Sequence, residues 1–293
     1  MDPTSANVQA NGLDFAYLEA GDGPLALCLH GFPDSPHGWR HLLPALADAG
    51  YRAVAPWMRG YAPTEIPEDG CYQQGALATD ANALHEALGG DERAVLIGHD
   101  WGATAVYPAV NHEPDRWRSA VAASVPHPAV AAGIMFDYDQ IKRSFYMFFF
   151  QHPLADAVVQ MGDMGFIDGL WDDWSPGLGA GDRADAVAGV KAALADPANL
   201  AAALGYYRAT IGGVGVDPAY DDIQNAGAAP VTVPMLYLHG RDDGCIGAGF
   251  ADQVADHLRH EDSRVEVLDG VGHFLQLEDP DRFNATVLAF LDR

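Results

Sequence analysis

VLIGHDWGATAV, residues 95–106, is the segment that decides the fold, because an apolar strand-like run leads directly into a run of helix formers. Gly98 and Gly102 flank Asp100 in the pattern G-x-D-x-G. Glycine at both positions permits a sharp turn, since no Cβ separates the strand from the helix. The segment therefore predicts a strand–turn–helix unit that lifts Asp100 above the sheet edge, facing the positive end of a helix.

The rest of the chain alternates short apolar runs with helical patterns. Strands are expected at residues 13–19, 24–30, 51–56, 93–98, 119–124, 234–240 and 264–270, and helices at 37–49, 75–88, 103–112, 247–260 and 280–291. Near-continuous apolar strands are typical of a parallel sheet covered on both faces. The alternation stops between residues 127 and 230. We predict an α/β core of residues 1–126 and 231–293, interrupted by a helical cap of residues 127–230.

Composition excludes several classes of protein. Sixteen Lys+Arg stand against 41 Asp+Glu in 293 residues, a formal net charge of −25. A nucleic-acid binder or a polybasic membrane anchor needs the opposite sign. Hydrophobic residues make up 49% of the chain, enough to bury a core. We see no signal peptide and no apolar run long enough to span a membrane, so we expect a cytoplasmic protein.

Metal and cofactor sites are not expected. The three cysteines, Cys28, Cys71 and Cys245, are too scattered for a disulfide framework or a CxxC metal site. The GGVG run at residues 212–215 is not followed by a phosphate-binding pattern. Neither feature predicts a metal or cofactor site.

Asp100 stands where most such turns carry a serine, and this changes the chemistry. A carboxylate is already charged at neutral pH and needs no base to activate it. Its attack on saturated carbon gives an ordinary ester, so an epoxide or an alkyl halide is favoured over an acyl substrate. The alternative is that Asp100 only caps the following helix.

Two further groups follow the last two predicted strands. Asp243 lies after the strand at 234–240, and His273 lies after the strand at 264–270. A histidine has the unperturbed pKa to activate water that would cleave the ester, and a carboxylate would orient it. Asp242 competes with Asp243 for this second role. An oxyanion hole is expected from the backbone N–H groups of Phe32 and Trp101.

The motifs together resemble the epoxide hydrolases of the α/β-hydrolase fold. The segments are HGFPDS (30–35), MRGYAPTEIP (58–67), GHDWGA (98–103), HGRDDG (239–244) and GVGHF (270–274), with SFYMFFFQHP (144–153), LWDDWSPG (170–177) and GYYRAT (205–210) between them. The resemblance implies that Tyr146 and Tyr207 are the ring-opening tyrosines of the cap, although Tyr206 is adjacent to Tyr207. Phenols remain protonated at neutral pH and can protonate the leaving oxygen.

The resemblance also implies a substrate and its surroundings. An apolar epoxide and water would give a vicinal diol, with Trp101, Phe32 and Pro33 around the substrate. Two departures adjoin this region: Trp57-Met58 replaces the Asp that this family usually carries, and Ala62 replaces its Gly. Both positions are expected to influence substrate choice.

Two other functions compete with this interpretation. Haloalkane dehalogenases share the Asp nucleophile and the following Trp, and Trp171 or Trp174 would supply their second halide donor. A ligand-binding protein without catalysis is the other alternative, which the intact Asp100, Asp243 and His273 disfavour. The sequence leaves open whether the protein is a homodimer.

Overall fold

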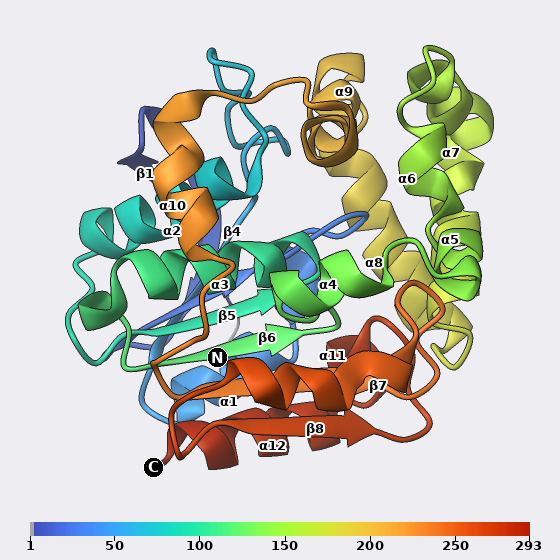
Figure 1. Cartoon of the computed structure of the whole chain (residues 1–293). Helices are drawn as coiled ribbons and strands as arrows, with labels where there is room; N and C mark the ends of the chain where they lie inside the picture. The colour runs from blue at the N-terminus through green and yellow to red at the C-terminus, as the bar shows by residue number, and fades with distance from the viewer. Residues whose placement is uncertain (1–2) are drawn as a thin grey trace.

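Residues 3–293 of the computed structural model are described here. One sheet of eight strands forms the centre, in the order β1-β2-β4-β3-β5-β6-β7-β8 (Figure 1). The strands are β1 (Thr4–Ala10), β2 (Leu13–Ala20), β3 (Leu25–Leu29), β4 (Arg52–Pro56), β5 (Val95–His99), β6 (Ser119–Ala123), β7 (Met235–Gly240) and β8 (Arg264–Leu268). β1 pairs with β2 and β2 pairs with β4 in antiparallel fashion, and all other pairs are parallel. The predicted α/β class is confirmed.

Helices cover both faces of the sheet. α1 (Leu42–Asp48) and α12 (Pro280–Leu291) bury their apolar residues against one face, where Ala26, Ile97 and Leu236 point. α2 (Gln74–Ala87) and α3 (Trp101–His112) cover the other face, where Leu27 and Leu96 point. β3, β5, β6 and β7 are buried along their whole length, as expected for strands covered on both faces.

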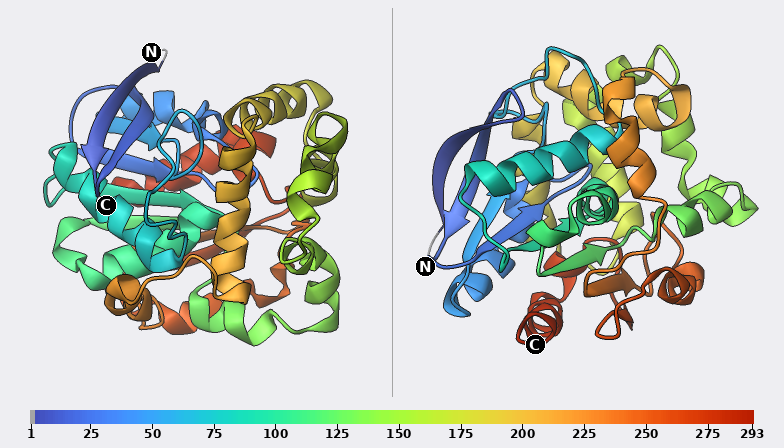
Figure 2. Two further views of the ribbon diagram at one scale, coloured as in Figure 1. Left: turned by 90° about the horizontal axis from the view of Figure 1, so that it is seen from above. Right: turned by 60° about the vertical axis from the view of Figure 1, so that its left-hand side comes forward.

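The chain between β6 and β7 is helical, and within the described residues it holds no named strand. Its helices are α4 (Pro128–Ile134), α5 (Tyr138–Arg143), α6 (Phe145–Phe149), α7 (Ala155–Trp174), α8 (Ala180–Ala193), α9 (Pro197–Tyr207), η3 (Arg208–Gly212), η4 (Pro218–Tyr220) and α10 (Asp221–Ala226). Figure 2 shows α6 to α9 together on one side of the molecule. α10 instead packs against α2 and α3. The cap boundaries at residues 127 and 230 stay a prediction.

Three local expectations need correction. The predicted helix at 37–49 divides into η1 (Pro36–Trp39) and α1. A continuous helix would place Pro44 in its interior, whereas a start at Leu42 places it in the first turn, where no N–H is needed. The predicted helix at 247–260 is the 3₁₀ helix η5 (Ala248–His257).

Strand β1 is the third correction, because the sequence did not predict it. Most of its residues are exposed or half-buried, so its apolar alternation is weak. β1 is held in the sheet by pairing with β2 over its whole length, from Thr4 opposite Glu19 to Ala10 opposite Leu13. Elsewhere, α11 (Leu275–Glu278) and η2 (Pro114–Arg116) are short connecting turns. No helix within residues 3–293 is both long and apolar enough to cross a membrane.

Candidate active site

The turn between β5 and α3 has the geometry that the glycine pattern predicts. Asp100 adopts φ 51° and ψ −118°, a strained region for a residue with a side chain. A Cβ on Gly102 would lie 2.1 Å from the carbonyl oxygen of Leu29, and one on Gly98 would lie 2.4 Å from the backbone of Gly102. Only glycine fits at these two positions, so β3, β5 and α3 approach closely and hold Asp100 at the sheet edge.

The two carboxylate oxygens of Asp100 have different surroundings. The backbone N–H of Phe32 donates to Oδ1 at 2.8 Å. Oδ2 lies 3.5 Å from Nε2 of His273. Gly31 makes the approach possible, since a Cβ there would lie 2.2 Å from Oδ1 and 2.6 Å from the backbone nitrogen of Trp101. The oxyanion role of the Trp101 N–H stays a prediction.

His273 is oriented by Asp243. Its Nδ1–H donates to Asp243 Oδ2 at 2.9 Å, and both side chains are buried. The other oxygen of Asp243 accepts from the backbone N–H groups of Cys245, at 2.7 Å, and Ile246, at 2.8 Å. Asp242 is exposed on the same loop. The geometry therefore favours Asp243 over Asp242 as the partner of His273.

The charges around His273 favour its protonated form in the resting protein. Burial by itself would lower the pKa of His273, but the carboxylates of Asp243 and Asp100 raise it to about 10. Burial opposes the charged form of Asp243, yet the neighbouring His273 imidazolium holds the pKa of that carboxyl below its ordinary value. An imidazolium between two carboxylates is the resulting resting state.

Two tyrosines from the helical segment lie opposite Asp100. Tyr146 comes from α6 and Tyr207 from α9, and their ring centroids are 5.5 Å apart. Burial, with Asp100 among the nearby acidic groups, raises the pKa of both phenols well above 10, so both keep their protons. The hydroxyl of Tyr207 has no hydrogen-bond partner among the described residues, and that of Tyr146 lies 3.3 Å from Sγ of Cys245.

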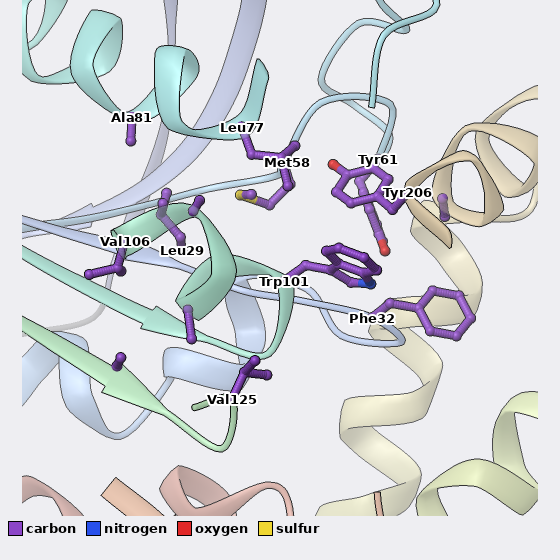
Figure 3. Packing of buried hydrophobic residues seen from close by; sticks show 14 of the residues in the cluster. Leu29, Phe32, Met58, Tyr61, Leu77, Ala81, Trp101, Val106, Val125 and Tyr206 are labelled. Atoms are coloured by element: carbon purple, nitrogen blue, oxygen red, sulfur yellow. The ribbon is translucent and has the colours of Figure 1, made fainter. Parts of the chain in front are cut away.

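Tyr206 has a different environment. Its hydroxyl donates to the carbonyl of Arg59 at 2.8 Å, and its ring stacks on Tyr72. Figure 3 shows it in one buried aromatic group with Tyr61, Trp101 and Phe32. Its hydrogen-bonding capacity is used inside the protein, so the structure favours Tyr207 as the free donor.

A cavity of about 110 Å³ adjoins Asp100. Its lining is mostly apolar and consists of Gln74, Asp100, Trp101, Thr104, Tyr107, Val125, Pro126, Pro128, Ala131, Ile134, Met135, Gln140, Ser144, Tyr146, Met147, Tyr207, Thr210 and Ile246. Trp101 lines it, as predicted for a substrate-binding residue. Phe32 and Pro33 do not: the Phe32 ring packs edge-on against Phe150 and Tyr207, while its backbone N–H serves Asp100.

Sequence analysis missed the buried histidine that holds the turn next to Asp100. His30 Nδ1–H donates to the carbonyl of Gly31 at 2.9 Å, and its Nε2 accepts from the Met58 N–H at 3.0 Å. Burial lowers the pKa of His30 to about 4, so it stays neutral and holds the Gly31 turn. The motif HGFPDS contains His30, but only the fold reveals its partner Met58.

His99 and Asp34 form a second buried pair. His99 Nε2–H donates to the backbone carbonyl of His273 at 2.9 Å, which leaves Nδ1 facing Oδ2 of Asp34 at 4.0 Å. Burial raises the pKa of Asp34 to about 7 and lowers that of His99 to about 3. His99 and the Ser124 hydroxyl, which donates at 2.8 Å, together fix the backbone carbonyl of His273.

One group of side chains within residues 3–293 has the spacing of metal ligands. Asp100, Cys245 and His273 offer ligand atoms that lie within 4.8 Å of one another. Two of these three are the proposed nucleophile and base. The expectation of a metal-independent reaction stays a prediction.

Comparison with known proteins identifies the family. Residues 24–280 match the α/β-hydrolase fold family. Epoxide hydrolase A of Mycobacterium tuberculosis is 32% identical over 99% of this chain and 97% of its own length. The crystal structure of Epoxide Hydrolase A from Mycobacterium thermoresistibile superposes with a TM-score of 0.79 at 28% identity, covering 99% of this chain and 98% of that one.

A third relative was crystallised with a reaction product. It is a point mutant of an epoxide hydrolase from Bacillus megaterium, in complex with a naphthyloxy-propane-diol, and it is 26% identical with a TM-score of 0.82. It covers 98% of this chain and 100% of its own. This chain therefore belongs to the α/β-hydrolase family and, within it, to the epoxide hydrolases.

Proposed function

We propose that the protein converts an apolar epoxide to a vicinal diol through a covalent ester on Asp100. The observation that carries the proposal is the cavity that Asp100, Tyr146 and Tyr207 line together. A nucleophile and two proton donors that share one small cavity can act on opposite ends of the same C–O bond.

The first step opens the ring. Oδ1 of Asp100 is held by the Phe32 N–H, so Oδ2 is the oxygen free to attack a ring carbon. A C–O bond forms to Oδ2 while the bond from that carbon to the epoxide oxygen breaks. The alkoxide that leaves takes a proton from the tyrosine pair, with the unpartnered hydroxyl of Tyr207 as the readier donor. The product is an alkyl ester of Asp100.

The second step cleaves this ester with water. Esterification removes the charge of Asp100, so the pKa of His273 falls and the imidazolium gives up its proton, which balances the proton that the tyrosine pair lost in ring opening. The neutral imidazole is then able to act as a base. It takes a proton from water, whose oxygen attacks the Asp100 carboxyl carbon. Oδ1 becomes the oxyanion, stabilised by the N–H of Phe32 and, we propose, of Trp101. The alkyl oxygen leaves, takes a proton from His273, and the diol is released. The Asp100 carboxylic acid that remains gives its proton to His273, which restores the carboxylate and the imidazolium.

A trapping experiment tests this mechanism. His273→Gln removes the base but leaves Asp100 and both tyrosines in place, so styrene oxide should alkylate Asp100 and stop there. Intact-protein mass spectrometry should show one substrate mass added, and peptide mapping should place it on Asp100. His260→Gln is the matched control. His260 is paired with Asp262 at the surface and has no role in the proposed mechanism. This variant should turn over the substrate without accumulating an adduct.

One outcome of this experiment would contradict the covalent mechanism. If His273→Gln loses turnover and gains no mass on Asp100, the covalent mechanism is wrong. A single turnover of the unmodified protein in ¹⁸O-water gives an independent measurement. The label should enter Asp100 and be missing from the first diol.

A haloalkane dehalogenase is the second candidate, and one observation favours it. The indole N–H of Trp101 is buried without a hydrogen-bond partner among the described residues, as a halide donor would be. The indole N–H of Trp171, however, donates to the carbonyl of Pro33 at 2.8 Å and is not available. Incubation with 1-bromobutane and with styrene oxide separates the two: bromide release without diol would establish the dehalogenase.

We also propose that a homodimer would form through the helical segment. The segment carries exposed large apolar side chains, from the end of α4 through α7 and after η3: Phe136, Tyr138, Phe145, Leu154, Met161 and Val214. Light scattering coupled to size exclusion should give the dimer mass, and a monomer at high concentration would rule it out. The cytoplasmic location stays a prediction.

A further inference from the structure

We propose that Gln151 and Arg208 hold the proton donor Tyr207 in place and are therefore positioning residues for the ring-opening step. This inference rests on the proposed function and deepens it, because neither residue lines the cavity. Two observations lead to it. The hydroxyls of Tyr146 and Tyr207 are held in different ways, and two hydrogen bonds cross between the segments that carry these tyrosines.

The two tyrosine hydroxyls differ in their anchors. The hydroxyl of Tyr146 lies 3.3 Å from Sγ of Cys245, so a contact at the tip of the side chain helps to fix its position. The hydroxyl of Tyr207 has no hydrogen-bond partner among the described residues. The place of Tyr207 in the cavity lining therefore depends on the packing of its ring and on the backbone at the end of α9.

Gln151 fixes that backbone. Its amide nitrogen donates to the carbonyl of Tyr207 at 3.1 Å and to the carbonyl of Met147, in α6, at 2.9 Å. A carbonyl only accepts, so the amide nitrogen must face both groups. The side chain also lies close against η3, since a Cβ on Gly212 would lie 2.6 Å from Oε1 of Gln151. One side chain thus joins the helix that carries Tyr146 to the end of the helix that carries Tyr207.

Arg208 makes the reciprocal connection. Its Nε–H donates to the carbonyl of Phe150 at 3.1 Å, and its guanidinium pairs with Asp156 in α7. Phe150 is fully buried, and its ring centroid lies 5.7 Å from that of Tyr146 and 5.1 Å from that of Tyr207. The two segments therefore exchange one hydrogen bond in each direction around a shared aromatic contact.

Proton transfer is sensitive to such a connection. An acid must lie within hydrogen-bond reach of the oxygen that it protonates, and a displacement of about 1 Å can slow a reaction by about 100-fold. A shift of the α9 end relative to α6 would move Tyr207 and leave Asp100 and His273, which lie on other elements, in place. Loss of either hydrogen bond should therefore slow ring opening through Tyr207.

A double-mutant cycle on the alkylation step tests the proposal. In the His273→Gln background, the rate at which styrene oxide adds its mass to the protein measures ring opening alone. Gln151→Met nearly preserves the size of the side chain but removes its donors, and we expect it to slow this rate about tenfold. When Tyr207→Phe is also present, Gln151→Met should change the rate by less than about twofold, because the hydroxyl that it positions is already missing.

The possible results separate a positioning role from a structural one. Gln160→Met, on the exposed surface of α7, is the matched control and should leave the rate unchanged. Equal slowing by Gln151→Met with and without the Tyr207 hydroxyl would show a general structural role, and no slowing in either case would show no role; both results overturn the inference. If His273→Gln alone forms no adduct, the proposed function fails, and the inference fails with it.

Arg208→Lys is the second variant, and it replaces Gln151→Met if circular dichroism shows that the latter does not fold. It keeps the positive charge opposite Asp156 but loses the Nε–H that donates to the Phe150 carbonyl. We expect it to slow alkylation several-fold, and only when the Tyr207 hydroxyl is present. Slowing that is independent of this hydroxyl, or no slowing at all, would again overturn the inference.

Discussion

At the scale of single residues, this site is distinguished by an aspartate where most turns of this kind carry a serine. The carboxylate needs no base, and its partner His273 rests as an imidazolium between Asp100 and Asp243. Such a histidine cannot accept a proton until one neighbouring charge is removed. Alkylation of Asp100 removes that charge, so we propose that the first step of the reaction prepares the base for the second.

Measuring the pKa of His273 in a variant that lacks the Asp100 charge tests whether the two steps are coupled. Asp100→Asn keeps the shape of the side chain but removes its charge, so the imidazolium loses one of the two carboxylates that stabilise it. The pKa of His273 should fall from its raised value near 10 toward its ordinary range. Imidazole chemical shifts followed by NMR against pH give the value in both proteins. An unchanged pKa would show that Asp243 alone holds the proton.

Adjacent tyrosines allow a controlled comparison of the proton donors. Tyr207→Phe removes the free hydroxyl over the cavity and should lower kcat for styrene oxide by about 100-fold, within the range for a lost general acid. Tyr206→Phe removes only the hydrogen bond to the Arg59 carbonyl. It should cost about 1 kcal/mol of stability and leave kcat within about twofold. The reverse pattern in steady-state kinetics and urea unfolding would assign the donor to Tyr206.

At the scale of elements, the strand–turn–helix unit was predictable because glycine spacing is a local signal. Gly98 and Gly102, on either side of Asp100, indicate a sharp turn, because a side chain at either glycine would clash with neighbouring backbone. The start of α1 was less predictable, since it depends on where Pro44 can be tolerated. β1 was not predictable from its residues, because it is an exposed edge whose order comes from its pairing with β2.

Glycine substitutions test the steric argument. A methyl group on Gly102 would meet the Leu29 carbonyl, so Gly102→Ala should destabilise the fold by about 3 kcal/mol. Gly133, within α4, has open space around it, and Gly133→Ala should be neutral or slightly stabilising. Urea midpoints give both values. Similar stabilities of the two variants would mean that β3 and α3 can separate at no cost.

At the scale of the whole molecule, the formal net charge of −25 is the dominant electrostatic feature. It repels anions from the surface, but it neither attracts nor repels an apolar, neutral epoxide. The net charge therefore does not contribute to the proposed recognition of the substrate. It does oppose compaction, because the acidic groups repel one another more strongly in the folded state than in the expanded chain.

Salt should relieve this repulsion. Raising NaCl from about 0.01 M to about 0.5 M shortens the screening length several-fold, so the urea midpoint at pH 7 should rise. Near the sequence pI of about 4.5 the net charge is close to zero, and the same salt step should have a smaller effect. A midpoint that falls or stays constant at pH 7 would show that local ion pairs outweigh the long-range repulsion.

The sequence by itself determined what depends on local chemistry and chain order: the parallel α/β core, the strained turn at Asp100, and the carboxylate and histidine that follow β7 and β8. Only the tertiary structure distinguishes neighbours: Asp243, and not Asp242, is bonded to His273, and Tyr207, and not Tyr206, lines the cavity. It also placed Trp101 in the cavity lining and left Phe32 and Pro33 out of it. Adjacent residues share a sequence environment but point in different directions, and that direction is set by contacts between segments far apart in the chain.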